Sequence, residues 1–543
     1  DGTAPLAQKL REKWLYELAR QENWSMYIQH YQPSTDASLQ CYAQFAAYQQ
    51  GDRQRAIVNS KLKWLTGDSL PPACDKLFIL LFKENVFNNA LIITRVKLAL
   101  ESRNYTLANY LLKKINHPLR HDDQILESIQ QHPQRITRLA PNELSSDFYL
   151  YGLKRLLTRN ATQAIKLWQQ AVRQARLTER QQQSFLTQVA LYKAMHNQYD
   201  APAWFAKIKQ PFNTEAVIDW HIRFALRHRD WATVESLIKH ATNHDSPCWQ
   251  YWLARAMEAQ GRHEQATIIY NNLAPNRHYY GFLASIRQHK PLQFDHETVT
   301  PGDQALQLYQ PITDQIKALY FSKQTARASR LVNDFASELP KDEKSAFAYW
   351  IANNLHWFGK SVYLSTHNDL ANQLNLRFPL AYHDLIKQQA THYHLSEALI
   401  FAMIRQESAF REDVISFAGA RGLMQVMPAT ARWLSTLRHI PFHDKAQLLS
   451  IPYNIMLGTA YLNQLGNRFN NHPLLMAAAY NAGPRQVQAW LNSHPLQQAD
   501  IWIETIPFYE TRNYLKNVIA FYAVYQHRLQ QKPNLDAFLR PFI

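Results

Sequence analysis

The first 300 residues alternate stretches of helical hydrophobic periodicity with short polar breaks. One break recurs: a two-residue polar turn, followed four positions later by a small or β-branched residue. The copies are Gly51-Asp52 with Ala56, Arg103-Asn104 with Ala108, Arg159-Asn160 with Ala164, Arg229-Asp230 with Val234, and Gly261-Arg262 with Ala266. The spacing of the last two copies, at positions 230 and 262, approaches the roughly 34 residues of a tetratricopeptide repeat. Small residues let paired helices approach closely, so the pattern predicts an α-solenoid of helical hairpins.

Two interruptions divide the remainder of the chain. Pro291, Pro301 and Gly302 break the polar run from residue 290 to 303, and helical periodicity then resumes. A second break lies at Phe378-Pro379, because a residue before proline is disfavoured in the helical region. We therefore predict a solenoid over residues 1–300, a small helical linker domain over 301–376 and a C-terminal domain over 377–543.

Composition narrows the class of protein. A chain of 543 residues is long enough for two or three domains, and its 13 glycines are too few for a large all-β fold or a phosphate-binding loop fold. Apolar runs such as residues 77–82 are far shorter than the roughly 20 residues that span a bilayer. The net charge of +16 favours a polyanionic partner, but no helix-turn-helix, RNP or zinc motif supports binding to nucleic acid.

Metal and disulfide chemistry are also limited by the sequence. The three cysteines, Cys41, Cys74 and Cys248, lack the spacing of a zinc site and allow at most one disulfide. His392 and His394 have no third ligand nearby, so no metal site is expected.

Glu407 is the candidate catalytic residue. A helix predicted to begin at Ser396, its N-cap, places Ile400, Met403, Ile404 and Glu407 on one apolar stripe. A carboxyl group buried there without a cation would have a raised pKa, as a general acid requires. The alternative is a structural glutamate, held by an ion pair with Arg405 or Arg411.

Two further segments carry unusual polar residues. Residues 416–428 contain Gly419 and Gly422, which permit close backbone approach to a ligand, and Gln425, which offers both a donor and an acceptor. Residues 477–484 form a helix that ends at Gly-Pro just after Tyr480-Asn481. Carboxylates are scarce in this domain, so a mechanism with one acid fits best; Glu504 and Asp413 are the candidates for a second.

Together these motifs resemble the soluble lytic murein transglycosylases. The resemblance rests on their order and spacing: Glu407-Ser408, Gly422-Leu423-Met424-Gln425, Ala479-Tyr480-Asn481-Ala482-Gly483-Pro484 and Glu504-Thr505-Ile506-Pro507-Phe508. It extends to Arg377-Phe378-Pro379-Leu380-Ala381-Tyr382, to Trp64-Leu65-Thr66-Gly67 and to residues 73–78, and so covers most of the chain.

The resemblance implies a mainly α fold: a goose-lysozyme-like catalytic domain attached to a ring or horseshoe of helical hairpins. It implies cleavage of the β-1,4 bond between N-acetylmuramic acid and N-acetylglucosamine in peptidoglycan, without water as the nucleophile and without a cofactor. Glu407 would protonate the glycosidic oxygen, and the N-acetyl group of the substrate would stabilise the cationic anomeric carbon. Glu407 would then take the proton of the muramoyl C6 hydroxyl as it attacks C1, which gives a 1,6-anhydro sugar.

The same resemblance implies roles for other residues. Ser416 and Tyr480 would hydrogen-bond Glu407 or the N-acetyl carbonyl, and Gln425 and Met427 would line the sugar subsite. Asn481 belongs to the same substrate-binding set, where it would brace the loop, and Glu504 would contact glycan or stem peptide. Cys41 and Cys74 would form a disulfide, which suits an oxidising periplasm, and Cys248 would remain a free, buried thiol.

The implied setting is the periplasm, with a signal peptide removed. The expected partners are glycan strands, stem peptides and cell-wall synthases, with no nucleic acid and no transmembrane segment, and the protein is expected to be a monomer. Two alternatives remain at this point: a hydrolysing muramidase that uses Glu504 or Asp413 as a second carboxylate, and a non-enzymatic scaffold that only holds glycan.

Overall fold

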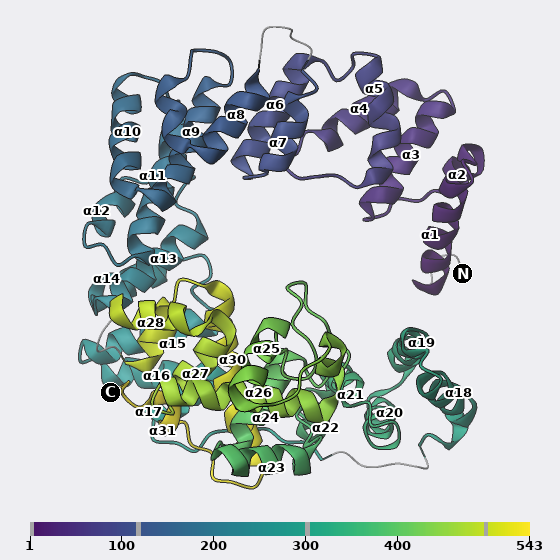
Figure 1. The fold of residues 1–543 in the computed structure, drawn as a ribbon, viewed down its shortest axis with the longest axis vertical. Helices are drawn as coiled ribbons and strands as arrows, with labels where there is room; N and C mark the ends of the chain where they lie inside the picture. Colours follow the sequence, from purple (N-terminus) through teal and green to yellow (C-terminus); the bar gives the residue numbers. More distant parts are fainter. Residues whose placement is uncertain (1–4, 116–120, 299–304, 367, 494–497, 543) are drawn as a thin grey trace. The chain divides into compact units, whose positions relative to one another are not determined.

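The computed structural model describes residues 5–115, 121–298, 305–366, 368–493 and 498–542, and it is built from α-helices (Figure 1). Within those ranges, the only β structure consists of two isolated bridges, which pair Ile415 with Arg421 and Arg421 with Val426. The chain divides into two compact units. The first contains Asp1–Lys193 and Asp200–Asn213, and the second contains Ala194–Tyr199 and Thr214–Ile543.

The first unit consists of short helices joined by tight turns. In chain order they are α1 (Pro5–Arg20), α2 (Trp24–His30), α3 (Ala37–Gln49), α4 (Arg53–Trp64), the 3-10 turn η1 (Pro72–Cys74), α5 (Asp75–Lys83), α6 (Asn89–Glu101), α7 (Tyr105–Leu112), α8 (Asp122–Gln131), the 3-10 turn η2 (Pro133–Arg138), α9 (Ser145–Arg159), α10 (Ala161–Arg173), α11 (Glu179–Met195, which ends in the second unit) and α12 (Ala201–Phe205).

The second unit begins with further hairpins and ends with the C-terminal domain. Its elements are α13 (Glu215–Arg227), α14 (Trp231–His240), α15 (Pro247–Ala259), α16 (His263–Leu273), α17 (Tyr279–Arg287), η3 (Gln307–Tyr309), α18 (Gln310–Phe321), α19 (Thr325–Glu338), α20 (Lys341–Asn354), α21 (Phe358–Ser365), η4 (Asn368–Leu370), α22 (Leu374–Arg377), α23 (His383–Tyr393), α24 (Glu397–Glu407), α25 (Pro428–Arg438), η5 (Lys445–Leu449), α26 (Ile451–Arg468), α27 (Pro473–Ala482), α28 (Pro484–Ser493), α29 (Ala499–Thr505), α30 (Tyr509–Arg528) and α31 (Asp536–Leu539).

The recurrent polar turn predicted from the sequence does join packed helices. The five copies connect α3 with α4, α6 with α7, α9 with α10, α13 with α14, and α15 with α16, and each pair is in contact. In three copies the second turn residue caps the following helix, since the side chains of Asn104, Asn160 and Asp230 accept a hydrogen bond from a backbone N–H three positions later. These caps explain why the second helix of each of these hairpins starts where it does.

The small residues of this motif lie where the paired helices meet. The motif positions in the second helices are almost fully buried, with exposed fractions of 0 or 1%: Ala56, Ala108, Ala164, Val234 and Ala266. A larger side chain at these positions would have to displace the facing helix, and overpacking of this kind typically costs about 1–3 kcal/mol. The pattern of the sequence therefore specifies both the turn and the contact behind it.

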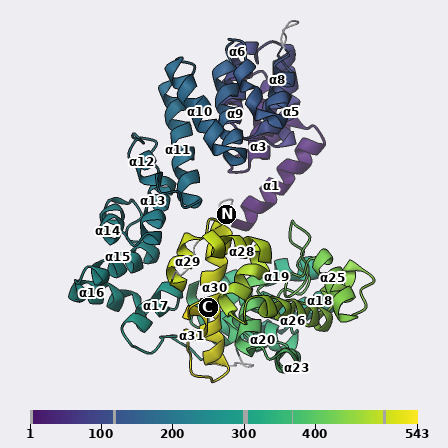
Figure 2. The ribbon, with the colours of Figure 1, turned by 60° about the vertical axis from the view of Figure 1, so that its left-hand side comes forward.

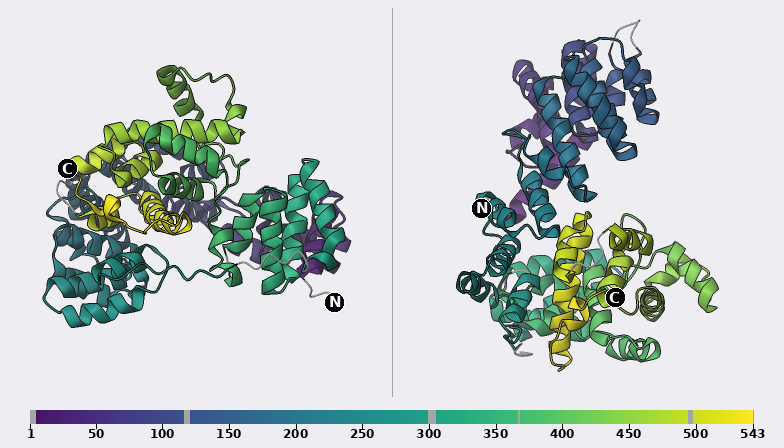
Figure 3. Two further views of the ribbon diagram at one scale, coloured as in Figure 1. Left: turned by 90° about the horizontal axis from the view of Figure 1, so that it is seen from below. Right: turned by 90° about the vertical axis from the view of Figure 1, so that its left-hand side faces the viewer.

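The helices between the last hairpin and the C-terminal domain form a small bundle with its own core. Helices α18, α19, α20 and α21 lie together as a group of teal to green helices (Figure 3). The side chains of Ile316, Val332, Phe347 and Ile351 are buried in its core. The domain boundary predicted between residues 300 and 301 lies outside the described residues. The boundary predicted between residues 376 and 377 falls on the last residues of α22, which ends at Arg377.

The C-terminal domain is organised around α24. This helix is apolar on all sides along most of its length, and Ala398 to Ile404 are at most 3% exposed. A helix of that composition has to be enclosed by other helices. The long helix α30, which runs vertically in Figure 2, lies against it, and α23 also contacts it. Within the described parts of the chain, no helix combines the length and hydropathy needed to cross a bilayer.

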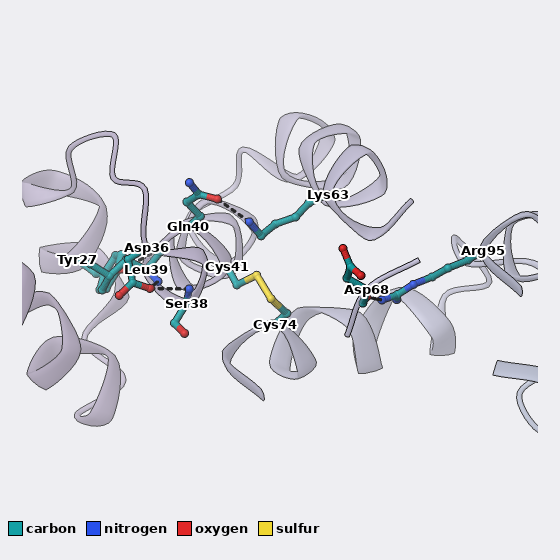
Figure 4. The surroundings of a disulfide bond; sticks show 10 residues. All are labelled: Tyr27, Asp36, Ser38, Leu39, Gln40, Cys41, Lys63, Asp68, Cys74 and Arg95. Atoms are coloured by element: carbon teal, nitrogen blue, oxygen red, sulfur yellow. Dashed lines mark hydrogen bonds between the residues drawn. A yellow bond between two sulfur atoms is a disulfide. The ribbon is translucent and has the colours of Figure 1, made fainter. Parts of the chain in front are cut away.

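A disulfide bond joins Cys41 on α3 to Cys74 in η1, as the resemblance to known proteins implies (Figure 4). Their Cα atoms are 4.8 Å apart and both side chains are buried. The bond ties α3 to the segment that starts α5. Cys248 is free, as expected, but it is only partly buried.

The disulfide predicts a measurable loss of stability on reduction. The bond closes a loop with a sequence separation of 33 residues. For such a loop the restricted entropy of the unfolded chain stabilises the fold by about 3–4 kcal/mol. Thermal unfolding followed by circular dichroism should show that the unit containing the disulfide unfolds at a lower temperature when reductant is added.

The double variant Cys41→Ser/Cys74→Ser is the matched control. It should unfold at this lower temperature whether or not reductant is present. A wild-type transition that does not move on reduction would contradict a stabilising role for the bond.

Candidate active site

Glu407 is the last residue of α24 and continues the apolar stripe of that helix. Ser396 caps the helix as predicted, since its Oγ accepts a hydrogen bond from the N–H of Leu399. Ile400 and Ile404 are fully buried, so the stripe carries the Glu407 carboxyl group toward the interior. The position of the side chain therefore follows from the periodicity of the helix.

The hydrogen-bond partner of Glu407 is Tyr514 on α30. The Tyr514 hydroxyl donates to Glu407 Oε1 at 2.6 Å, and the tyrosine itself is 4% exposed. Sequence reasoning did not find Tyr514, which is 107 residues away along the chain. The one signal in the sequence is helical periodicity, which places Tyr514 on the same buried face of α30 as Val518 and Tyr525. A tyrosine hydroxyl group on a buried face needs a hydrogen-bond partner.

No cation compensates the charge of Glu407. Arg405 donates its Nε–H to the carbonyl of Arg377 at 2.9 Å, and Arg411 donates its Nε–H to the carbonyl of Ser408 at 3.3 Å. Within the described ranges no Lys, Arg or His forms an ion pair with Glu407. The alternative of an ion pair with Arg405 or Arg411 is therefore not what the structure contains.

Burial without a cation raises the pKa of Glu407 to about 7. Desolvation is the largest cause, the hydrogen bond from Tyr514 acts in the opposite direction, and the negative charge of Glu510 raises the pKa a little further. A carboxyl group in this condition can exist in both protonation states near neutral pH. It can therefore give up a proton and take one back, which is what acid–base catalysis requires.

The segment after α24 folds as a tight loop that is held by hydrogen bonds from the side chain of Asn454. Asn454 on α26 is 1% exposed; its amide donates to the carbonyls of Arg421 and Leu448, and its Oδ1 accepts from the N–H of Met424 at 2.7 Å. Gly422 has a φ of +73°, and a Cβ there would lie 2.3 Å from the Leu448 carbonyl oxygen. Only glycine satisfies both conditions, which explains this residue of the motif.

Most of the predicted binding residues hold this loop together. Ser416 Oγ accepts from the N–H of Ala420 at 3.0 Å. Gln425 has a φ of +50°, and its Nε2 donates to the carbonyls of Val414 and Gly422, whereas its Oε1 makes no hydrogen bond with the described residues. The side chain of Met427, directly before α25, is 38% exposed.

The helix α27 brings two more predicted residues to the loop. The Tyr480 hydroxyl donates to the carbonyl of Met424 at 2.7 Å, and its pKa is raised well above the usual value by burial and then by the charge of Glu407. Asn481 Oδ1 accepts from the hydroxyl of Thr511 on α30 at 2.7 Å. Tyr480 is thus near both the loop and Glu407, and Asn481 joins α27 to α30.

Glu504 lies in a different environment, buried among cations and only 1% exposed. Its carboxylate pairs with Arg223 on α13 at 3.2 Å and with Lys516 at 2.8 Å, and it accepts from the Tyr280 hydroxyl at 2.7 Å. These cations hold the pKa of Glu504 far below its ordinary value despite complete burial. A carboxylate enclosed in this way has no surface for a sugar, so the expected contact with glycan or stem peptide is not supported.

A second buried ion pair, like that of Glu504, joins α29 to the helical hairpins. Asp500 pairs with Arg255 on α15 and accepts from the Tyr251 hydroxyl at 2.8 Å. Arg227 on α13 donates to the carbonyl of Thr505 at 2.7 Å. Helix α29 is therefore fixed to the last helical hairpins by charged groups from α13 and α15. Sequence reasoning missed these partners, because they come from more than 200 residues earlier in the chain.

Two protein families match this part of the chain. The family described as "Transglycosylase SLT domain" matches residues 384–503, which include Glu407, the loop and α27. The family described as "Soluble lytic transglycosylase helical domain" matches residues 505–534, which include Tyr514.

Relatives cover nearly the whole chain. The soluble lytic murein transglycosylase of Salmonella typhimurium is 30% identical over 548 residues, which cover 98% of this chain and 84% of that protein. The soluble lytic murein transglycosylase of Escherichia coli K12 is 29% identical over 547 residues, with the same coverage.

Solved structures show the same architecture. An inactive mutant of the lytic transglycosylase Slt from Pseudomonas aeruginosa superimposes with a TM-score of 0.84 at 29% identity, covering 100% of this chain and 88% of that one. The 70 kDa soluble lytic transglycosylase of Escherichia coli gives a TM-score of 0.82 at 27% identity, covering 98% and 88%. The predicted fold class, a helical solenoid with a lysozyme-like catalytic domain, is confirmed by these relatives.

The network around Glu504 predicts a large, pH-dependent contribution to stability. Glu504→Gln leaves half-buried Lys516 without a counter-charge and buried Arg223 with Asp219 as its one remaining partner, which should cost about 3 kcal/mol. Because the pKa of Glu504 is lowered in the folded state, its contribution is complete above the unfolded value of about 4.3 and is lost as the pH falls below it. The difference in denaturation midpoint between wild type and variant should therefore shrink in acid.

Glu297→Gln is the control for this experiment. Glu297 pairs with Lys341 at 3.0 Å in the same unit, but both side chains are more than 40% exposed. Its loss should cost less than about 1 kcal/mol. Equal effects of the two variants at neutral pH would contradict the account of Glu504.

Proposed function

The chain belongs to the family of soluble lytic murein transglycosylases, and on that basis we propose that it cleaves peptidoglycan with Glu407 as its single acid and base. The bond cleaved is the β-1,4 linkage between N-acetylmuramic acid and N-acetylglucosamine. The observation that carries the proposal is the placement of Glu407: its carboxyl group accepts from Tyr514 at 2.6 Å and has no ion pair with a described cation, and desolvation raises its pKa to about 7.

The first step is proton transfer to the leaving group. Protonated Glu407 donates its proton to the glycosidic oxygen, the bond from C1 to that oxygen breaks, and N-acetylglucosamine leaves with a free 4-hydroxyl group. The N-acetyl carbonyl of the muramoyl residue stabilises the positive charge on C1, as in other substrate-assisted glycosidases. Tyr514 holds Oε1 by its hydrogen bond, which leaves Oε2 to carry the transferred proton.

The second step closes the new ring and restores the acid. Glu407, now a carboxylate, takes the proton of the muramoyl C6 hydroxyl while O6 bonds to C1. The products are a 1,6-anhydromuramic end and a new N-acetylglucosamine end. No water is consumed, and Glu407 returns to its protonated state. A group that serves as acid and then as base works best when its pKa lies near the working pH.

The neighbouring residues are proposed to bind the sugar or to position the loop. Gln425 would accept from a sugar hydroxyl through its free Oε1, and Met427 would contact the sugar ring through its exposed side chain. Ser416 and Tyr480 would keep the loop facing Glu407, and Asn481 would act through Thr511 as a positioning residue.

The proposed domain roles follow from this assignment. Residues 377–543 would carry out catalysis, residues 1–300 would form the solenoid and residues 301–376 would link the two. The substrate places the enzyme at the cell wall, in the periplasm. The positive charge of the chain would favour attraction to an anionic wall polymer.

A hydrolysing muramidase on the same scaffold would need a second carboxylate. Glu504 is neutralised by Arg223 and Lys516 and is buried, which argues against it in this role. Asp413 lies in an exposed turn. The exposed Glu510 is the carboxylate whose charge raises the pKa of Glu407. It is therefore the residue to test for the role of a second carboxylate.

The products that the protein forms from purified peptidoglycan should decide between lytic transglycosylation and hydrolysis. Mass spectrometry should find 1,6-anhydromuramic ends with the wild type, and Glu407→Gln should lower the rate by at least about 100-fold, because a general acid–base group is typically worth that much. Glu510→Gln, a matched removal of one carboxylate, should retain most of the rate and give the same products.

Two results would contradict the proposal. Reducing muramic acid ends, heavier by one water molecule, would show hydrolysis. Unchanged turnover of peptidoglycan by Glu407→Gln would favour the non-enzymatic scaffold instead.

A further inference from the structure

A second site candidate lies in the first unit, far from Glu407 in the sequence. A cavity of about 280 Å³ opens between the turn after α6, the start of α7, the end of α8 and the second half of α9. Its lining contains four basic residues and no acidic one. The basic residues are Arg103, Lys154, Arg155 and Arg159, and we call them the basic pocket.

The four cations of the basic pocket have no carboxylate partner. None of them forms an ion pair with a described Asp or Glu. The Glu101 carboxylate, whose charge raises the pKa of Lys154, is outside the lining of the cavity and pairs with Arg180 at 3.5 Å. The lining of this cavity therefore carries positive charge without a carboxylate in direct contact.

Two of the cations are partly buried without a full set of partners. The Nε of Arg155 is buried and makes no hydrogen bond. Lys154 has no hydrogen bond with a described residue; burial lowers its pKa, and the positive charge of Arg103 lowers it further. Keeping a buried donor unsatisfied costs about 1–3 kcal/mol, so an arrangement of this kind is expected where a ligand supplies the missing acceptor.

The rest of the cavity suits a ligand with oxygen atoms and some apolar surface. Tyr105 and Tyr151 contribute aromatic walls, and the Arg155 charge acts on both hydroxyl groups. Arg103 and Arg159 stand at the exposed rim, and Arg159 already donates to the carbonyl of Gln131 at 2.9 Å. Guanidinium groups bind carboxylates and phosphates through paired hydrogen bonds, which a single ammonium cannot match.

We propose that the basic pocket is a binding site for an anionic group, a carboxylate or a phosphate, held by the guanidinium groups of Arg103, Arg155 and Arg159 and by Lys154. For a protein that acts on peptidoglycan, the source we favour is a carboxylate of the peptide stems. This choice of source rests on the proposed function, whereas the presence of an anion site does not. The site would hold the wall polymer through a part of it that is not cleaved.

The test uses full-length protein with Glu407→Gln, so that no probe is degraded. The pocket variant adds Lys154→Met/Arg155→Gln, and the rim variant adds Arg103→Gln/Arg159→Gln, which alters exposed residues and spares the fold. The control variant adds Lys166→Met/Arg173→Gln on α10, where both residues are exposed and outside the cavity. Each variant removes two positive charges, and thermal unfolding checks that each is folded.

Three probes distinguish the sources of the anion in calorimetric titrations. They are a disaccharide that carries a peptide with free carboxylates, the same compound with amidated carboxylates, and inorganic phosphate. The pocket and rim variants should bind the free carboxylate form about tenfold more weakly than the control variant does, because charge-assisted hydrogen bonds are lost. The amidated form should bind equally to all variants.

Each outcome has a defined meaning. Loss of phosphate binding in the pocket and rim variants, with unchanged peptide binding, would support the anion site and make phosphate its ligand. No difference from the control variant with any probe would overturn the proposal. The same substitutions in protein with Glu407 intact should leave cleavage of peptide-free glycan unchanged; absence of that cleavage in wild type would overturn the proposed function alone.

Discussion

The burial of one carboxyl group without a cation governs the C-terminal domain. Helix α24 is apolar on every side from Ala398 to Ile404, and its periodicity carries Glu407 inward against Tyr514 of α30. A shift of the pKa from 4.5 to about 7 corresponds to about 3 kcal/mol, which the fold loses as the pH rises between these values and Glu407 ionises. Packing of α24 against α30 has to offset this cost, and Ala398 to Ile404 are at most 3% exposed.

Two glutamates of this domain, the half-buried Glu407 and the buried Glu504, behave in opposite ways. Glu407 has a tyrosine beside it and a raised pKa, whereas Glu504 has Arg223 and Lys516 and a lowered pKa. Desolvation raises the pKa of both carboxyl groups, and the cations beside Glu504 reverse the direction of its shift. The first group can exchange a proton near neutral pH. The second stays ionised and fixes α29 to the helical hairpins. The residues around each glutamate therefore decide whether it is suited to catalysis or to holding the domain in place.

The sequence predicted contacts between residues that are close along the chain and missed contacts between residues that are far apart. The hairpin turns, the Ser396 cap and the inward direction of Glu407 depend on residues within a few positions, and periodicity identifies them. Tyr514, Asn454 and Arg223 act on residues 30 to 281 positions away, and nothing in a single sequence pairs them. Glu504 was interpreted as a binding residue because its motif is visible locally, while the cations that enclose it are not.

The pKa of the Glu407 carboxyl group is the quantity that tests this account most directly. Carbon-13 NMR of protein labelled at the glutamate carboxyl carbon, with Glu407→Gln to assign the signal, gives it by titration. We expect a midpoint near pH 7 that moves upward in Tyr514→Phe, since the tyrosine hydrogen bond lowers the pKa. A midpoint near the ordinary glutamate value of about 4.3 would contradict the central claim that burial alone prepares this acid.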